Sequence, residues 1–146
     1  FLSLISKFPV CNLNLNKHTN HHIYRAALES IALRTRDIII EMEKDAGIKF
    51  SSLKVDGGAS NNNLLMQIQS DLLNTSVIRP KTTETTALGA AQLAALGVGE
   101  VRSVDELSER WYLDRRFVPR MSIAQRAKLI EGWQAAVAGV LASEPE

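Results

Sequence analysis

The sequence has 146 residues, of which 17 are basic and 16 acidic, and the formal net charge is +1. This length allows one domain with a real core but is short for an enzyme of two lobes. So small a net charge excludes a general attraction to nucleic acid. The single cysteine, Cys11, excludes an internal disulfide and indicates a reducing compartment, the cytoplasm. No apolar run approaches the ~20 residues of a membrane span, so we expect no membrane partner.

Residues 1–18 differ in character from the rest of the chain. They open on Phe1 rather than methionine, and asparagine alternates with leucine over 12–16. We interpret 1–18 as an atypical segment at the head of a truncated product, with a divergent but genuine segment as the alternative. The predicted division is therefore 1–18 and a single domain over 19–146.

A long helix is predicted from about residue 19 to residue 46. Gly47 supplies a stop signal for this helix. Its apolar residues recur at three- and four-residue steps, and they are Tyr24, Leu28, Ile31, Ile38 and Met42. Alanines 26, 27 and 32 suit a close packing face. Glu29 lies mid-helix, where a carboxylate is usually solvated or paired, and we assign it no role in a reaction.

The stretch from Leu53 to Asn63 contains the residues that most clearly indicate a binding function. An alternating strand pattern over 52–55 is broken by Gly57 and Gly58, and a helical period follows. We predict a helix over about 60–73, with Ser60 or Asn61 as its N-cap. Glycines allow positive φ and close approach of a ligand to the main chain. A helix N-terminus attracts anions. The turn suits a nucleotide, although a plain strand–helix connection is the alternative on this motif alone.

The remaining elements follow in order. A second strand, parallel to the first, is expected over 77–80, and a polar loop over 82–86. A helix of small residues over 87–96 is expected to pack tightly against another element. Spacings typical of capping boxes begin a short helix at Ser103 and a last helix at Ser122 that runs to about residue 141. The segment 111–118 between them has an extended pattern.

Several of these motifs occur together in one known family. They are Val55-Asp56-Gly57-Gly58-Ala59, Asn62-Asn63, Leu65-Met66-Gln67, Arg79-Pro80, and Glu84-Thr85-Thr86-Ala87-Leu88-Gly89-Ala90-Ala91. Upstream, 22–29 and 35–37 add two further runs. From about Thr19 to its end the chain resembles the carboxy-terminal domain of the FGGY carbohydrate kinases. The runs 84–91 and 65–71 favour a polyol-phosphorylating member. A related pentulose or hexulose kinase and a non-catalytic actin-like module are the alternatives.

The resemblance implies an α/β fold, part of an actin-like (ribonuclease H-like) ATPase lobe whose sheet is incomplete here. An incomplete sheet leaves a strand edge unpaired, which predicts marginal stability. The family transfers the γ-phosphoryl group of ATP to a polyol hydroxyl. ATP and ADP are therefore the expected ligands, and Mg²⁺ the expected ion. A homo-oligomer is possible for the full-length enzyme.

The resemblance also assigns roles to four residues. Gly58 contributes a backbone contact to the nucleotide, Asn62 reaches the adenine, and Asp56 and Gly57 shape the turn. No catalytic residue and no metal ligand is expected in this chain, because the family's aspartate base, Mg²⁺ ligands and polyol pocket belong to the other part of the protein. We therefore expect the 146-residue chain to have no kinase activity by itself.

Overall fold

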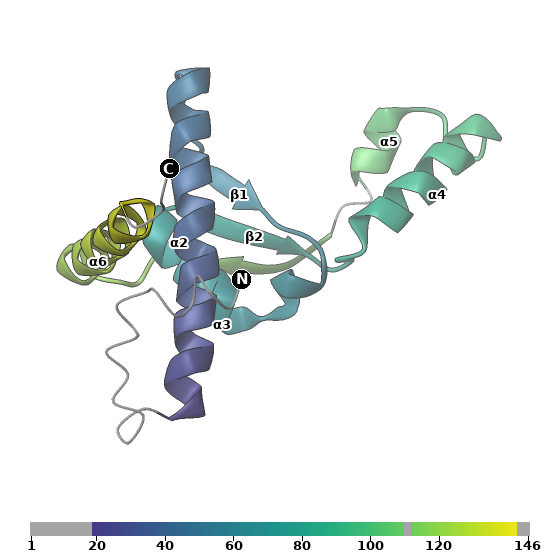
Figure 1. Ribbon diagram of the computed structural model, residues 1–146. Helices are drawn as coiled ribbons and strands as arrows, with labels where there is room; N and C mark the ends of the chain where they lie inside the picture. Colours follow the sequence, from purple (N-terminus) through teal and green to yellow (C-terminus); the bar gives the residue numbers. More distant parts are fainter. Residues whose placement is uncertain (1–18, 110–111, 143–146) are drawn as a thin grey trace.

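The computed structural model describes residues 19–109 and 112–142 (Figure 1). The elements along the chain are α2 (Asn20–Ala46), β1 (Ser52–Lys54), a 3-10 helix (Gly58–Asn61), α3 (Asn63–Leu73), β2 (Ser76–Pro80), α4 (Thr85–Gly97), α5 (Val104–Glu109), β3 (Leu113–Phe117) and α6 (Ile123–Leu141). This order confirms the α/β class, the long first helix and the strand–helix–strand unit at its centre.

Three strands form one sheet in the order β1-β2-β3. β1 and β2 are parallel, with Leu53 opposite Val77, as the sequence predicted. β3 runs antiparallel to β2, with Phe117 opposite Val77. Leu113–Phe117, within the segment predicted to be extended, thus supplies a third strand and covers the edge of β2 that two strands alone would leave open. A single irregularity in this pairing falls beside Arg79 and Pro80.

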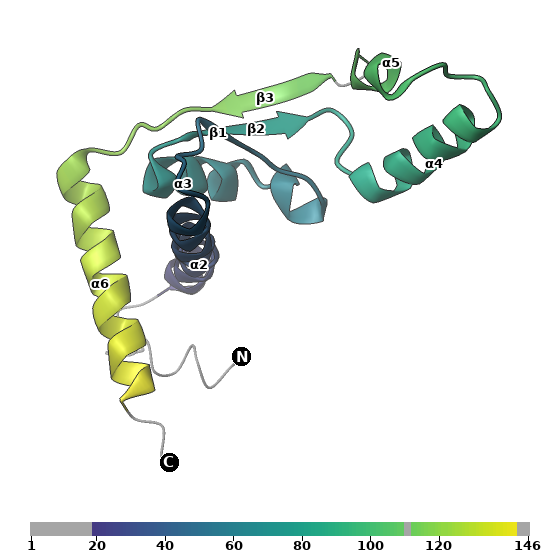
Figure 2. The same ribbon diagram turned by 90° about the horizontal axis from the view of Figure 1, so that it is seen from above.

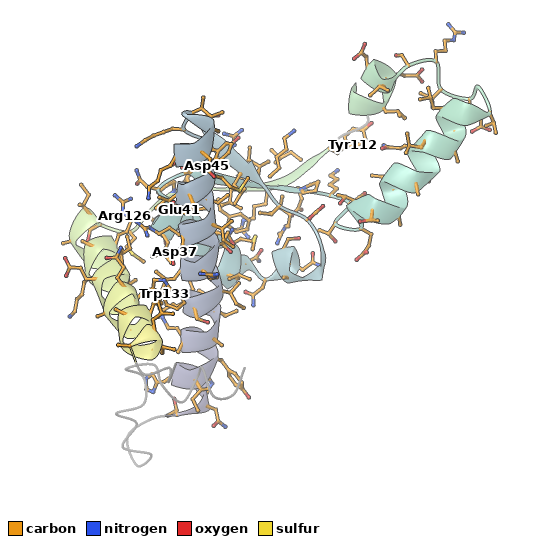
Figure 3. The ribbon with its side chains drawn as sticks, turned by 45° about the horizontal axis from the view of Figure 1, so that its top comes forward. Asp37, Glu41, Asp45, Tyr112, Arg126 and Trp133 are labelled. Atoms are coloured by element: carbon orange, nitrogen blue, oxygen red, sulfur yellow. The ribbon has the colours of Figure 1, made fainter. Side chains whose placement is uncertain are left out.

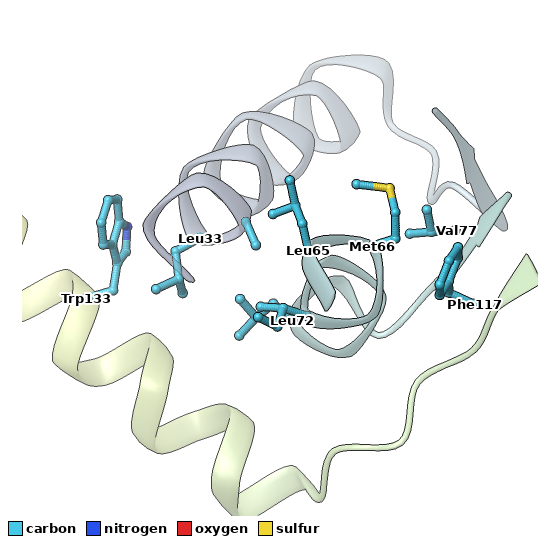
Figure 4. Packing of buried hydrophobic residues seen from close by; sticks show 9 residues of the cluster. Leu33, Leu65, Met66, Leu72, Val77, Phe117 and Trp133 are labelled. Carbon is cyan, nitrogen blue, oxygen red and sulfur yellow. The ribbon is translucent and has the colours of Figure 1, made fainter. Parts of the chain in front are cut away.

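The helices over the sheet form two layers on one face (Figure 2). α3 contacts β2 and β3, and α2 crosses the outer side of α3. The core extends from the sheet past α3 to α2 and α6 (Figure 4) and comprises Ala32, Leu33, Leu65, Met66, Ile68, Leu72, Val77, Phe117 and Trp133. Leu72 is only 2% exposed, and burying a side chain of this size stabilises the fold by about 1.5–3 kcal/mol.

The face of α2 that meets the core agrees only in part with the predicted one, of which Leu28 packs against the core. The buried residues are Ala32 and Leu33. Ala32 is fully buried and its small side chain lets α3 approach closely, as predicted, whereas Ala27 is exposed. Tyr24, however, is 66% exposed, and Ile31, Ile38 and Met42 are also exposed. An outer-layer helix is covered on one side only, so apolar spacing alone misplaced the contact.

α4 and α5 stand away from the sheet and the other helices (Figure 1). No residue of α4 is buried, so the predicted tight packing of its small residues does not occur within the described chain. The helix also begins at Thr85, ahead of the predicted Ala87. The reason is that the Glu84 carbonyl accepts from the Leu88 N–H at 3.1 Å and closes a turn inside the expected loop.

α6 returns to lie beside α2 (Figures 1 and 2). The Ser122 side chain accepts from the Gln125 N–H, and the Gln125 side chain reaches back to Ser122, which confirms the capping box. The buried residues of α6 are Trp133 and Ala136. Ser103 likewise accepts from the Glu106 N–H at the start of α5. None of the helices in the described ranges has the length and apolar character to cross a membrane.

Candidate functional site

The carboxyl ends of β1 and β2 bring two loops together. The loop after β1, residues Asp56–Asn62, is called the glycine turn below. Its Gly57 N–H donates to the carbonyl of Thr83, in the loop after β2, at 2.8 Å. Just before it, the Val55 N–H donates to the Ile78 carbonyl at 3.0 Å and extends the β1–β2 pairing. In open α/β sheets ligands bind beyond the carboxyl ends of parallel strands, which is where this turn lies.

The two glycines of the turn have different conformations. Gly57 has φ +76°, in the region that favours glycine. Gly58 is the first residue of the 3-10 helix and does not have a positive φ. The expectation of positive φ at both glycines was therefore wrong for Gly58. A Cβ built on Gly58 would meet no atom of the described residues within 4 Å, so the main chain there is open to a ligand.

Buried Ser60 holds the turn closed from inside. Its N–H and its Oγ both donate to the Gly57 carbonyl, at 3.0 and 2.7 Å. Its own carbonyl accepts from Nη1 of Arg79, on β2, at 2.7 Å. Three hydrogen bonds on one residue therefore determine how the glycine turn sits on the sheet.

Asn62, and not Ser60 or Asn61, is the N-cap of α3. Its Oδ1 accepts from the N–H groups of Leu64 and Leu65, at 3.0 and 3.1 Å. The predicted cap was wrong because Ser60 and Asn61 form the 3-10 helix, which delays the start of α3. The amide Nδ2 of Asn62 has no partner among the described residues, and the side chain is exposed. It therefore keeps two N–H donors for a ligand.

Asp56 is bonded to the other loop of the site. Its Oδ2 accepts from the hydroxyl of Thr85, the first residue of α4. This link ties the glycine turn to the start of α4 and gives the exposed carboxylate a structural partner. Thr85 and Arg79 are residues of the site whose roles sequence reasoning missed. The sequence feature that could have predicted a structural role for Arg79 is its position in an otherwise apolar strand, since a buried arginine is almost always paired.

The glycine turn is an open surface and not an enclosed pocket. Two cavities in the described part of the chain lie elsewhere, and neither is lined by residues of the turn. One, of about 230 Å³, lies between α2, α3 and α6, and the other, of about 500 Å³, is lined by residues that include Arg25, Asp71 and Lys128. Among the described residues, no group of three or more His, Cys, Asp or Glu side chains could hold a metal ion.

A family model described as "FGGY family of carbohydrate kinases, C-terminal domain" matches residues 9–98. The chain belongs to this family. The resemblance seen in the motifs is thus confirmed. The matched range also includes the glycine turn, so the site described above lies within the FGGY domain.

Individual FGGY kinases are similar over most of this domain. A glycerol kinase of Nitratidesulfovibrio vulgaris (strain DSM 19637 / Miyazaki F) is 60% identical over 119 residues, which are 82% of this chain and 24% of that protein. A glycerol kinase of Aeromonas salmonicida is 56% identical over 117 residues, 80% of this chain and 23% of that protein. The FGGY domain described here therefore spans about a quarter of the length of these relatives.

Solved FGGY kinases have the same fold. The crystal structure of Plasmodium falciparum glycerol kinase with ADP matches with TM-score 0.69 and 38% identity, over 80% of this chain and 24% of that one. A xylulose kinase of Rhodospirillum rubrum matches with TM-score 0.66 and 25% identity, over 84% and 25%. These matches confirm the predicted fold class, part of the actin-like ATPase lobe of these enzymes.

Proposed function

We propose that this FGGY domain is the carboxy-terminal, nucleotide-binding part of a glycerol kinase, which transfers the γ-phosphoryl group of ATP to glycerol and forms glycerol 3-phosphate. Two glycerol kinases with 56% and 60% identity support this substrate over the pentuloses. The similar Plasmodium falciparum enzyme was solved with ADP, which supports an adenine nucleotide as the ligand.

The observation that carries the proposal is the open main chain of the glycine turn beside a free amide. Gly58 presents its backbone with no neighbour where a Cβ would lie. Asn62 has its oxygen occupied by the cap of α3, so its amide N–H groups are the part that can reach the adenine. Gly57 supplies the bend and Asp56 ties it to Thr85. We assign Gly58 and Asn62 to the nucleotide, and Gly57 and Asp56 to the shape of the turn.

Phosphoryl transfer depends mainly on positioning and on stabilising the charge that develops on the transferred group. In this proposal the described residues bind and orient the nucleotide and take no part in moving the proton of glycerol. Around the turn, the described residues include no group of three His, Cys, Asp or Glu side chains that could hold Mg²⁺ by themselves. The base, the Mg²⁺ ligands and the glycerol pocket belong to the three quarters of the relatives that this chain does not match.

The proposal also includes a cytoplasmic location and a possible homo-oligomer of the complete enzyme. The location is supported by the single cysteine, which excludes an internal disulfide. The small net charge of +1 supports a small-molecule enzyme without a nucleic-acid partner.

A chimeric enzyme tests the proposed activity. Residues 19–146 would replace the matching segment of the Nitratidesulfovibrio vulgaris glycerol kinase and, in a second chimera, that of the Rhodospirillum rubrum xylulose kinase. ADP release would be followed with glycerol for the first chimera and with xylulose for the second. Because each host supplies its own acceptor pocket, the two chimeras compare how well this domain completes each kind of kinase. We expect turnover in the glycerol kinase chimera and little in the xylulose kinase chimera. The control chimera carries the matching segment of the Aeromonas salmonicida enzyme in the glycerol kinase host. If the control is active and our folded chimera is not, or if only the xylulose kinase chimera is active, the proposal is wrong.

A further inference from the structure

We propose that Arg79 and Asp114 are positioning residues for the nucleotide: together they hold the glycine turn in its binding conformation without touching the ligand. The proposal rests on the function proposed above and names residues to which nothing has so far assigned a role. It starts from an unusual placement, an arginine that is only 9% exposed at the end of the central strand.

Each end of the Arg79 guanidinium has a separate partner. Nε donates to Asp114 Oδ2, on β3, at 2.7 Å. Nη1 donates to the Ser60 carbonyl, in the glycine turn, at 2.7 Å. The guanidinium also lies 5.4 Å from the centre of the Phe117 ring. Arg79 therefore joins β3 to the glycine turn across β2.

The irregularity in the sheet explains how Asp114 reaches this position. Arg79 is paired with Arg115, and Pro80 with Leu113, so Asp114 is an extra residue on β3. Such a bulge changes the direction of a side chain, and bulges are frequent beside active sites. The Asp114 side chain is 42% exposed, so a carboxylate at the surface fixes an arginine whose side chain is 10% exposed.

The link acts on the atoms that shape the site. The Ser60 carbonyl accepts a hydrogen bond from Arg79, and the Ser60 N–H and Oγ donate to the carbonyl of Gly57. Gly58, the proposed contact with the nucleotide, lies between these two residues. Asn62, the other proposed contact, follows Ser60 by two positions. Without the guanidinium, the Ser60 carbonyl would lose its partner at a buried residue, and the turn would shift or loosen.

Lysine cannot replace Arg79 in this geometry. The two acceptors, Asp114 Oδ2 and the Ser60 carbonyl, are reached by two different nitrogens of one planar group. An ammonium is a point charge on a flexible stem and lacks this rigid fork. We therefore expect Arg79→Lys to keep the charge and much of the stability but to lose part of the positioning.

The experiment uses the full 146-residue chain and the variants Arg79→Lys, Arg79→Met and Asp114→Asn. ADP is titrated calorimetrically, and hydrogen exchange of residues 57–62 is measured with and without ADP, at a temperature where each variant is folded by circular dichroism. We expect the dissociation constant for ADP to rise about tenfold in Arg79→Met, and about threefold in Arg79→Lys and Asp114→Asn, since hydrogen bonds to charged groups are being lost. In the absence of ADP, the amide hydrogens of residues 57–62 should exchange faster than in the wild type. The increase should be largest in Arg79→Met and smaller in Arg79→Lys and Asp114→Asn.

Arg115→Met is the matched control. Arg115 lies opposite Arg79 and 5.0 Å from the same Phe117 ring, but it has no hydrogen bond to the glycine turn. Its loss should leave both the ADP affinity and the exchange of the turn unchanged. Asp114→Asn keeps the experiment decisive if Arg79→Met does not fold, because Asp114 is a surface residue.

The proposed nucleotide site and the proposed positioning role of Arg79 and Asp114 would be overturned by different results. If Gly58→Val weakens ADP binding while the Arg79 and Asp114 variants bind as the wild type does, the nucleotide site stands and the positioning role is overturned. If ADP neither binds to the wild-type chain nor protects 57–62 in it, the nucleotide is misplaced and both proposals fail. A loss of stability with unchanged ADP affinity would show that Arg79 serves the fold only.

Discussion

The indole N–H of Trp133 lies 2.6 Å from Oδ2 of Asp37 and joins α6 to α2 across 96 positions of sequence (Figure 3). Trp133 is 9% exposed, and a buried indole usually needs a partner for its N–H. The other oxygen of Asp37, Oδ1, accepts from Arg36 at 3.3 Å. This bond secures the last helix to the first at the edge of the core.

Trp133→Phe should destabilise the chain by about 1–3 kcal/mol, because Oδ2 of the part-buried Asp37 carboxylate loses its donor while Arg36 reaches only Oδ1. Asp37→Asn should cost less, since the amide oxygen can still accept from the indole. Urea unfolding followed by circular dichroism measures both. Glu41→Gln is the control: this exposed carboxylate on the same helix pairs with exposed Lys44, and its loss should change stability by less than about 1 kcal/mol. Equal stability of Trp133→Phe and wild type would show that the bond does not secure α6.

Two variants of Asn62 should separate its cap from its proposed contact with adenine. Asn62→Ala removes the acceptor for Leu64 and Leu65 and should cost about 0.5–2 kcal/mol of stability. Asn62→Ser keeps a capping oxygen and should cost little. Both remove the amide, so both should raise the dissociation constant for ATP about twofold to tenfold. Unfolding curves and ATP titrations of the chimera are the measurements, and normal ATP affinity in Asn62→Ser would remove Asn62 from the binding site.

Substitutions at the two glycines should fail for different reasons. Gly57→Ala places a side chain at φ +76° and should cost about 1–2 kcal/mol of stability. Gly58→Ala has open space and no positive φ, so it should leave stability almost unchanged. Gly58→Val should weaken ATP binding, because its branched side chain fills the space proposed for the ligand, while glycerol binding in the chimera should not change. If Gly58→Val binds ATP normally, the glycine turn is only a connection between β1 and α3.

The 146-residue chain, made alone, should show no measurable glycerol-dependent release of ADP. None of its described residues is proposed as the base, and a positioned base typically contributes about 10²–10⁴-fold to the rate. A coupled assay with ATP and glycerol tests this, with the active chimera as the positive control. Robust turnover that survives further purification would place a complete active site within these residues.

Local patterns were enough to predict most of the secondary structure. The long helix ends at Ala46, and Gly47 caps it in the left-handed conformation that glycine favours. The Ser122 capping box begins α6 as its spacing requires. The motifs between residues 22 and 91, taken together, also identified the family, since each of them is a short contiguous run of sequence.

Tertiary structure decided which residues meet. Periodicity placed Tyr24 and Ile31 with the core of α2, but only one side of this helix is covered, and Ala32 and Leu33 occupy it. The 3-10 helix moved the cap of α3 to Asn62. The links from Arg79 to Ser60 and from Trp133 to Asp37 cross 19 and 96 positions of sequence. A pattern confined to one helix or strand determines its own conformation and ends, whereas such contacts depend on how the layers pack, so only the folded chain brings them together.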